Sequence, residues 1–492
     1  MNRVAVSVAA IFIVAVLLGI GWQSAIAADD LLHSIVNAEV QRTADPSFVA
    51  GLLDADPPVA ARAALALGRT GQPAAIPPLR AHLHVRASAV RAMVVYALGL
   101  LDDAASLPDI RDLARRDENS AVRYAASDAI GRILAQVPAS ASAGVASDLL
   151  KVAASDSNAV VRGHALVQLG AFRGTSSAGT VELSLERIEV SDEDGNVRWH
   201  AAWMLARSFA EIADVKFLKA QLRDASDLIR IESVRALGIH GAPGAEAIVR
   251  TMLSDPSWRV QLEVGEALRR LAHEARTEHL TADPTGLHLP AVPALPAHAV
   301  ADDPPVASPS PAPKIPPPDT SALDLGVPFL PLTASEMNGP LPGPHPRVLI
   351  QTTKGDVVVR LYPEWAPTTV ASFLALTQSG FFNGNRWFRI VPDFVVQTGD
   401  PTNTGDGDPG YTIPAEENPI EQRTGVISMG LDYKDNLPVR DSAGSQFYIT
   451  LSPQLHLDRS FSTFGEVESG FDVLAHLIES DRMTTVSRLP DR

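Results

Sequence analysis

Apolar residues recur every three or four positions through the first half of the chain, a spacing that places them on one face of an α-helix. In residues 88–99, for example, Val90, Val94, Ala97 and Leu98 share one face. The same frame of a β-branched residue, an arginine, apolar residues and mostly a closing Leu-Gly returns along the chain. Its strong copies are 88–99, 120–131, 159–170, 195–206 and 227–238, and its weaker copies are 57–68 and 257–269.

The arginines of the strong copies set the length of the repeat. They recur at intervals of 32 to 39 residues, which fits one pair of helices per repeat, and they are Arg91, Arg123, Arg162, Arg198 and Arg230. Stacked helix pairs bury a continuous core through contacts between neighbours. We expect residues 29–280 to form an all-α solenoid, and the repeat resembles the HEAT-like repeats of bacterial scaffold proteins and bilin lyases.

The recurrent arginine allows two interpretations. It could line a groove for an acidic partner, or it could bond to carboxylates of adjacent turns. The structural interpretation is favoured, because a chain with a net charge of −16 attracts anions poorly. The candidate carboxylates lie at or just before the start of their copies, and they are Asp117, Asp194, Asp227 and Asp255.

From residue 346 to residue 485 the apolar pattern changes to the alternation that is typical of β-strands. Residues 347–363 predict two strands around a turn at Lys354-Gly355, and residues 425–430, 445–451 and 461–467 predict further strands. Residues 366–380 and 470–480 carry helix signals. Many short strands with two helices predict a closed antiparallel β-barrel with capped ends, followed by a short tail over 486–492.

Between the two domains the composition is rich in proline. Nearly half of the 38 prolines lie between residues 284 and 346, so residues 281–345 are expected to form an extended linker between independently moving domains. A proline-rich ligand for another protein is the alternative.

The N-terminus has the pattern of an export signal. Arg3 is followed by an almost wholly apolar run over residues 4–20 and by Ala25-Ile26-Ala27, a typical cleavage site. Residues 1–28 are therefore predicted to be a cleaved signal peptide or, alternatively, an uncleaved anchor. The protein is expected in the periplasm or secreted, or held at the inner membrane if the segment is uncleaved.

Composition excludes several kinds of function. A net charge of −16 argues against a nucleic-acid partner, and the absence of cysteine excludes disulfides, thiolate zinc sites and cysteine nucleophiles. The 13 histidines show no metal-ligand spacing. The glycine-rich stretch 399–410 does not fit a calcium-binding loop, because Tyr411 stands where the bidentate glutamate belongs, and it is predicted to be a surface loop. No cofactor and no metal are expected.

One arginine in the C-terminal domain is surrounded in the sequence by apolar residues. Arg389 lies among Trp387, Phe388, Ile390 and other apolar residues, although a guanidinium is costly to bury without a partner. It could form an ion pair with Asp393 or Asp400. Nearby aromatic residues such as Phe394 and Tyr448 would, by themselves, be ordinary core residues.

Three motifs around this arginine occur in a familiar order. Residues 355–384, 388–411 and 444–467 resemble the opening hairpin and helix, the catalytic strand with its glycine-rich loop, and the far pocket wall of the cyclophilin-type peptidyl-prolyl cis-trans isomerases. The resemblance covers roughly 135 of the 492 residues. It implies a prolyl isomerase domain acting on proline-containing polypeptides.

The resemblance implies a role for each site residue. Arg389 would stabilise the twisted amide, and Gln397 would brace the guanidinium or bond the substrate backbone. The proline ring would lie in an apolar slot, and other side chains and the Gly430 backbone would hold the preceding residues. The implied substrate-binding residues are Phe394, Val395, Gly430, Gln446, Tyr448, His456, Leu457 and Phe461.

The chain departs from the family pattern at several of these positions. Phe388 and Phe461 replace common histidines, and His456 stands where animal enzymes usually have tryptophan. Tyr448 replaces phenylalanine, and residues 430–443 form a longer loop than usual. These departures imply retained but modest activity and poor binding of cyclosporin, which tight binding in a titration would contradict.

The sequence therefore favours an exported prolyl isomerase for unfolded or extended substrates, with the solenoid as a docking platform for an unknown partner. The alternative is a non-catalytic scaffold that binds proline-containing segments. Retention of Arg389, Phe394, Gln397 and Gln446 favours catalysis.

Overall fold

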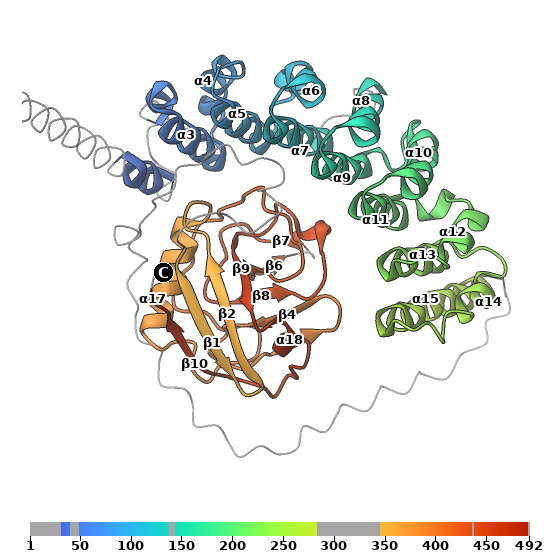
Figure 1. Cartoon of the computed structure of the whole chain (residues 1–492). Helices are drawn as coiled ribbons and strands as arrows, with labels where there is room; N and C mark the ends of the chain where they lie inside the picture. Colours follow the sequence, from blue (N-terminus) through green and yellow to red (C-terminus); the bar gives the residue numbers. More distant parts are fainter. Residues whose placement is uncertain (1–30, 40–48, 137–142, 283–344, 435–436, 491–492) are drawn as a thin grey trace, which may run out of the picture. The chain divides into compact units, whose positions relative to one another are not determined.

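A computed structural model of the chain describes residues 31–39, 49–136, 143–282, 345–434 and 437–490 (Figure 1). The predicted signal segment 1–28 and almost all of the predicted linker 281–345 lie outside these residues. Within the described ranges, no helix combines the length and apolar character needed to cross a membrane.

The described chain forms two compact units. One unit contains the described residues up to Gln136 together with the C-terminal domain, and the other contains residues 143–282. The first repeat helices therefore belong to the same compact unit as the C-terminal domain, whereas the predicted boundary separated all of residues 29–280 from it. Hydrogen bonds and ion pairs connect these helices to the C-terminal domain.

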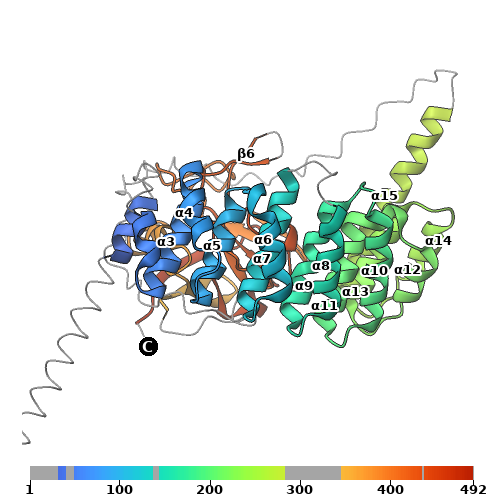
Figure 2. The same ribbon diagram turned by 90° about the horizontal axis from the view of Figure 1, so that it is seen from above.

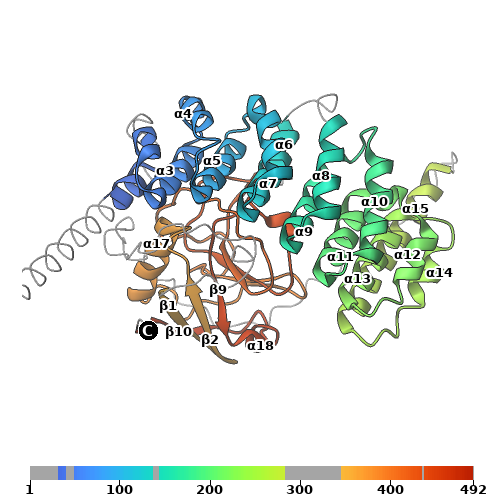
Figure 3. The same ribbon diagram turned by 45° about the horizontal axis from the view of Figure 1, so that its top comes forward.

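Each repeat is a pair of antiparallel helices, as the sequence predicted (Figure 2). The first unit has a helix over 31–39 and the helices α3 (Pro57–Thr70), α4 (Ile76–Ala81), α5 (Ser88–Leu100), α6 (Leu107–Arg116) and α7 (Ser120–Gln136). The second unit has α8 (Ala143–Ser155), α9 (Ala159–Gln168), α10 (Ala178–Ser191), α11 (Gly195–Met204), α12 (Val215–Gln221), α13 (Asp227–His240), α14 (Ala245–Arg250) and α15 (Trp258–Ala282), which Figure 3 shows stacked side by side.

The glycine that ends the repeated motif allows neighbouring helices to approach closely. A Cβ atom added to Gly99 in α5 would lie 2.8 Å from the Cα atom of Ala129 in α7. A Cβ atom added to Gly238 in α13 would lie 2.7 Å from the Cβ atom of Ala267 in α15. Such distances leave no room for a larger residue, which explains the recurrent Leu-Gly.

The recurrent arginines form a ladder of buried bonds. Arg162 donates from Nη1 to the Asp156 carbonyl at 2.9 Å, and from Nε and Nη2 to the Asp192 carboxylate at 2.8 Å each. Arg91 with Asp117 and Arg230 with Asp255 repeat this two-pronged bond at 2.9 Å. The structural interpretation is therefore confirmed.

The ladder differs from the prediction in its partners and in its uniformity. Asp192 takes the place of the predicted Asp194, which instead accepts N–H groups at the start of α11. Arg198 donates to the carbonyl oxygens of Asp192 and Glu193. Sequence spacing alone did not distinguish the carboxylate that caps a helix from the one that meets the neighbouring arginine.

The C-terminal domain is a curled antiparallel sheet of eight strands. They are β1 (Arg347–Thr352), β2 (Gly355–Leu361), β3 (Arg389–Val391), β4 (Val395–Thr398), β5 (Val426–Met429), β8 (Phe447–Thr450), β9 (Thr463–Ser469) and β10 (Met483–Arg488), in the order β10-β1-β2-β9-β5-β8-β4-β3. The sheet is a half-barrel with β10 and β3 at its edges, and not the fully closed barrel that was predicted; an isolated bridge joins Arg386 and Arg482 just before these two strands. A small hairpin, β6 (Tyr433–Lys434) and β7 (Leu437–Pro438), lies in the longer loop.

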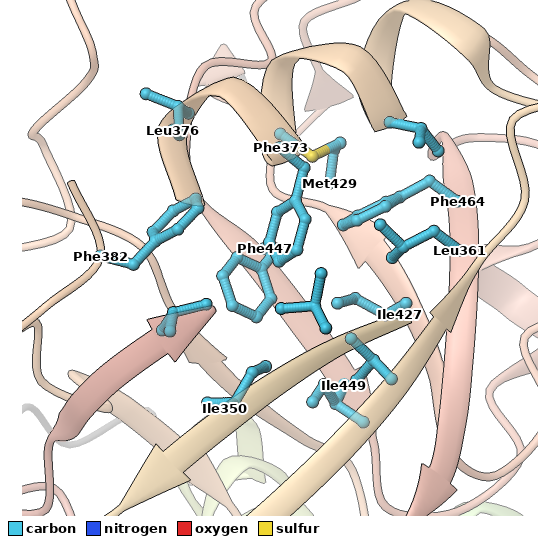
Figure 4. Packing of buried hydrophobic residues seen from close by; sticks show 14 of the residues in the cluster. Ile350, Leu361, Phe373, Leu376, Phe382, Ile427, Met429, Phe447, Ile449 and Phe464 are labelled. Carbon is cyan, nitrogen blue, oxygen red and sulfur yellow. The ribbon is translucent and has the colours of Figure 1, made fainter. Parts of the chain in front are cut away.

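The inner face of the sheet and one helix enclose an aromatic core (Figure 4). Helix α17 (Pro367–Gln378) contributes Phe373, whose ring lies 5.3 Å from those of Phe447 and Phe464 and 5.1 Å from that of Phe382. All four side chains are buried, so the core fixes α17 on the sheet. The predicted helix over 366–380 is confirmed.

The second predicted helix, over 470–480, is much shorter than expected. Helix α18 spans only Phe471–Leu474. The carboxylate of Asp481 accepts the N–H of Ile478 at 2.8 Å and turns the chain toward β10, so the helical pattern stops early.

Candidate active site

Alternation along the strands gives the sheet a second, polar face. Arg389 pairs with Gln397 across β3 and β4, Gln397 pairs with Tyr448 on β8, and Tyr448 pairs with Ser428 on β5. Cross-strand partners point to the same side of a sheet. The residues between them, such as Val396 and Ile449, belong to the aromatic core. Three predicted site residues, Arg389, Gln397 and Tyr448, therefore form a row across β3, β4 and β8 on the face away from the core, and Ser428 on β5 continues it.

This row lines a groove of about 1010 Å³. Nine of the ten predicted site residues line it, and they are Arg389, Phe394, Val395, Gln397, Gly430, Gln446, Tyr448, Leu457 and Phe461. His456 is the exception. Its ring stacks against that of Phe394, with 5.7 Å between the ring centres and an interplanar angle of 14°, so it contacts a groove residue without lining the groove itself.

The guanidinium of Arg389 lies at the mouth of the groove. Its Cζ atom is 5.5 Å from the centre of the Phe394 ring, and its Nη1 donates to Gln397 Oε1 at 3.3 Å. The side chain is exposed, and within the described residues no carboxylate forms an ion pair with it. The proposed pairs with Asp393 and Asp400 are therefore absent, and the cation remains available to a ligand.

A chain of amide side chains holds this arginine in place. Gln397 Nε2 donates to Gln446 Oε1 at 3.2 Å. Gln446 Nε2 in turn donates to the carbonyl oxygens of Gly405 and Gly407 at 2.8 and 3.1 Å. Because each amide both accepts and donates, the chain fixes the orientation of each side chain as far as Arg389.

The floor of the groove is apolar. Val395, Tyr448 and Phe461 form a small buried cluster of their own, against which Phe394 and Leu457 pack. The rings of Tyr448 and Phe461 meet edge to face at 5.6 Å. Burial raises the pKa of the Tyr448 hydroxyl well above its ordinary value, so it stays neutral. The slot therefore suits a small saturated ring such as that of proline.

The backbone at Gly430 is less available than the resemblance implied. The Gly430 N–H donates to the Gln446 carbonyl at 2.8 Å. This N–H therefore cannot also hold the substrate, although the residue lines the groove.

The glycine-rich stretch after β4 forms a groove wall that the sequence did not predict. Thr404, Gly405, Asp406, Gly407 and Asp408 all line the groove. The buried Asp400 carboxylate organises this wall by accepting three backbone N–H groups, those of Thr402, Thr404 and Gly405. Burial opposes ionisation of Asp400, but these hydrogen bonds outweigh it and lower its pKa.

The longer loop supplies the opposite rim. Leu431, Asp432, Tyr433 and Ser442 line the groove, and the Tyr433 side chain is 61% exposed. The prediction that residues 430–443 alter one rim is consistent with this position. Three acidic residues, Asp406, Asp408 and Asp432, line the groove that contains Arg389.

Comparison with known proteins agrees with this geometry. Residues 347–489 match the family described as cyclophilin type peptidyl-prolyl cis-trans isomerase/CLD, and residues 46–139, 146–227 and 215–283 match HEAT repeats. The chain belongs to the cyclophilin-type peptidyl-prolyl cis-trans isomerases, with HEAT repeats before the isomerase domain.

Individual relatives cover the C-terminal domain. The chain is 37% identical over 147 residues to a peptidyl-prolyl cis-trans isomerase of Synechococcus elongatus, which covers 30% of this chain and 97% of the relative. It is 42% identical over 128 residues to peptidyl-prolyl cis-trans isomerase B of Bacillus subtilis, and the match covers 26% of this chain and 85% of that relative. The crystal structure of a Cryptosporidium parvum cyclophilin type isomerase covers 30% of this chain and 99% of that chain, with 26% identity and a TM-score of 0.28.

Proposed function

We propose that the groove catalyses rotation about Xaa-Pro bonds in unfolded or extended polypeptides, with Arg389 as the catalytic residue. The observation that carries the proposal is the placement of the Arg389 guanidinium beside an apolar slot, held by Gln397 and with no ion pair in the part of the chain that the structure describes. Rotation about an amide needs neither a nucleophile nor a cofactor, because no bond to another group forms.

The barrier to this rotation comes from amide conjugation and amounts to about 18–20 kcal/mol. As the amide twists, its nitrogen regains a lone pair, and a donor fixed near that nitrogen stabilises only the twisted state. Preferential binding of the transition state is what accelerates a reaction. In this groove the slot of Phe394, Leu457 and Phe461 would hold the proline ring while Arg389 donates to the nitrogen.

The test is a measurement of cis-trans exchange in an Xaa-Pro peptide by NMR, with the full chain as catalyst. We expect exchange far faster than the uncatalysed time of tens to hundreds of seconds, and saturation at high peptide concentration. Exchange at the uncatalysed rate, together with measurable peptide binding, would instead support the non-catalytic scaffold.

We also propose export and a docking role for the repeats of residues 143–282. Export is supported by Arg3, the apolar run over 4–20 and the small-residue cleavage site at Ala25-Ile26-Ala27.

Docking is supported by the exposed apolar side chains of Leu183 and Val190 on α10, which are 65% and 59% exposed. Cross-linking of the native protein in the cell-envelope fraction, followed by N-terminal sequencing, checks both. We expect a mature start directly after the predicted segment 1–28 and a partner attached to α10. An intracellular protein with its N-terminus intact would contradict export.

A further inference from the structure

The first repeats contact the isomerase domain through a buried cluster of charges. Arg69 in α3 is only 1% exposed and has three partners. Its Nη1 donates to Glu39 Oε1 at 2.8 Å, its Nη2 to the Trp365 carbonyl at 2.7 Å, and its Nε to the Glu417 carbonyl at 2.9 Å. One side chain of the repeats thus binds two separate segments of the isomerase domain.

Charge in this cluster is balanced. Arg62, about two turns before Arg69 in α3, forms an ion pair with Glu39 at 2.5 Å. On the isomerase side, the buried Glu416 carboxylate accepts the N–H groups of Thr368 and Thr369 at 2.9 and 2.8 Å. Glu416 therefore holds the first turn of α17, where a helix favours negative charge. Two buried cations and two buried anions balance one another, so removal of any one leaves a net buried charge.

A second contact reaches the wall of the groove. Arg459 of the isomerase domain forms an ion pair with Asp128 of α7 at 2.8 Å. Asp128 is 1% exposed and also binds Arg132 at 3.1 Å. Arg459 has a φ of +66°, a backbone conformation that a non-glycine residue adopts only when its surroundings hold it there. It lies between Leu457 and Phe461, and both of these residues line the groove.

A third contact holds the rim that the longer loop forms. Arg440 Nη2 donates to the Arg69 carbonyl at 3.3 Å, and Arg440 Nε lies 3.3 Å from the Glu417 carboxylate. Inside the loop, the Val439 N–H donates to the Asp432 carbonyl at 2.8 Å, and the Asp432 N–H donates to Ser442 Oγ at 2.9 Å. These bonds connect the position of Arg440 directly to that of Asp432 in the groove.

We propose that the first repeats are a positioning part of the isomerase site: α3 holds the rim loop through Arg440, and α7 holds the opposite wall through Arg459. The groove then reaches its substrate-binding shape only while these helices are docked. This inference rests on the proposed isomerase function and adds Arg440 and Arg459 as positioning residues.

The test uses the full chain and the substitution Arg440→Ala, because Arg440 is 40% exposed and does not contribute to either core. We expect KM for a proline peptide to rise about threefold to tenfold, the effect of one lost hydrogen bond, while kcat stays within twofold. Amide hydrogen exchange at Asp432 and Val439 should accelerate. Arg440→Lys should bring KM part of the way back to the wild-type value. The control Arg360→Ala, on β2, should change neither KM nor the amide exchange rates at Asp432 and Val439.

Two outcomes would overturn the inference: an unchanged KM in an active Arg440→Ala protein, or unchanged amide exchange at Asp432 and Val439 in any case. An inactive wild-type protein would contradict the proposed function alone, since the exchange measurement still tests the docking. As a second variant, Arg69→Met should lower the melting temperature by several degrees and accelerate exchange at the same amides.

Discussion

Replacement of Arg389 by alanine is expected to lower kcat/KM for prolyl isomerisation about 100-fold to 1000-fold. This is the loss seen when one fixed donor to a transition state is removed. Arg389 is exposed and contributes no ion pair among the described residues, so the fold should not change. Peptide binding should persist, because the apolar slot of Phe394, Tyr448 and Phe461 remains.

The measurement is NMR exchange or a protease-coupled assay of wild type, Arg389→Ala and Arg389→Lys, with melting temperature as the control for folding. Lysine keeps the charge but lacks the planar fork, so we expect an intermediate rate. If Arg389→Ala were as active as wild type, the catalytic role of this residue would be wrong, even with the groove intact.

The substitution Glu189→Gln is expected to raise the free energy of unfolding of the second repeat unit at pH 8 by about 2–4 kcal/mol. Glu189 in α10 is 2% exposed. Its Oε1 accepts a hydrogen bond from Gln221 at 2.9 Å, but its Oε2 is buried and has no hydrogen-bond partner among the described residues. Burial, with the negative charges of Asp224, Glu186 and Glu232 nearby, raises the pKa of Glu189 to about 8.

The sign of the pH dependence follows from this raised pKa. Between pH 4.5 and pH 8 the folded protein keeps a proton on Glu189 that the unfolded chain releases. The stabilisation is complete below the unfolded pKa and is lost as the pH rises through the folded pKa. Glutamine mimics the protonated acid and keeps the bond to Gln221, so the variant should lack this loss.

Urea unfolding of the full chain at pH 6 and pH 8 checks the prediction. Wild type should lose more stability than Glu189→Gln between these values. The free energy of unfolding of the variant should still fall somewhat between pH 6 and pH 8, because burial also raises the pKa of Glu182 to about 7. Glu246→Gln is the matched control, since Glu246 is exposed and pairs only on the surface with Arg250. An equal loss of unfolding free energy between pH 6 and pH 8 in wild type and Glu189→Gln would contradict the prediction.

The sequence predicted the repeats and the groove because both depend on local patterns. The Leu-Gly endings reflect a close approach of neighbouring helices, as between Gly99 and Ala129. The groove residues sit on short strands whose alternation places Arg389, Gln397 and Tyr448 on one face.

The contact between repeats and isomerase could not be predicted in the same way. Its residues are single charges without a repeating pattern, and Arg69 and Glu417 are 348 positions apart. A lone Arg69 after the first Leu-Gly resembles an ordinary C-terminal helix cation. Only the fold shows that it is buried among carbonyl oxygens of another domain.

The glycine-rich stretch is a surface loop, as predicted, with Thr402, Thr404, Asp406, Asp408 and Gly410 exposed. Its part in the groove wall was not predicted. The structure uses Asp400 as an internal acceptor of backbone N–H groups. A carboxylate followed closely by threonine and glycine is a signal for such a turn, and it would have pointed to a shaped wall.

The arginine ladder has a built-in end. In α15 the position equivalent to Arg230 in α13 is occupied by Gln261, whose Nε2 donates to the Asp255 carbonyl at 2.7 Å, as Arg230 does to the Asp224 carbonyl. The neutral amide of Gln261 makes the hydrogen bond to the preceding turn but carries no charge, so it does not need a carboxylate from a further repeat. The last helix pair of the described repeats therefore needs no further carboxylate at this position. An engineered extension of the array would have to begin by placing an arginine at residue 261.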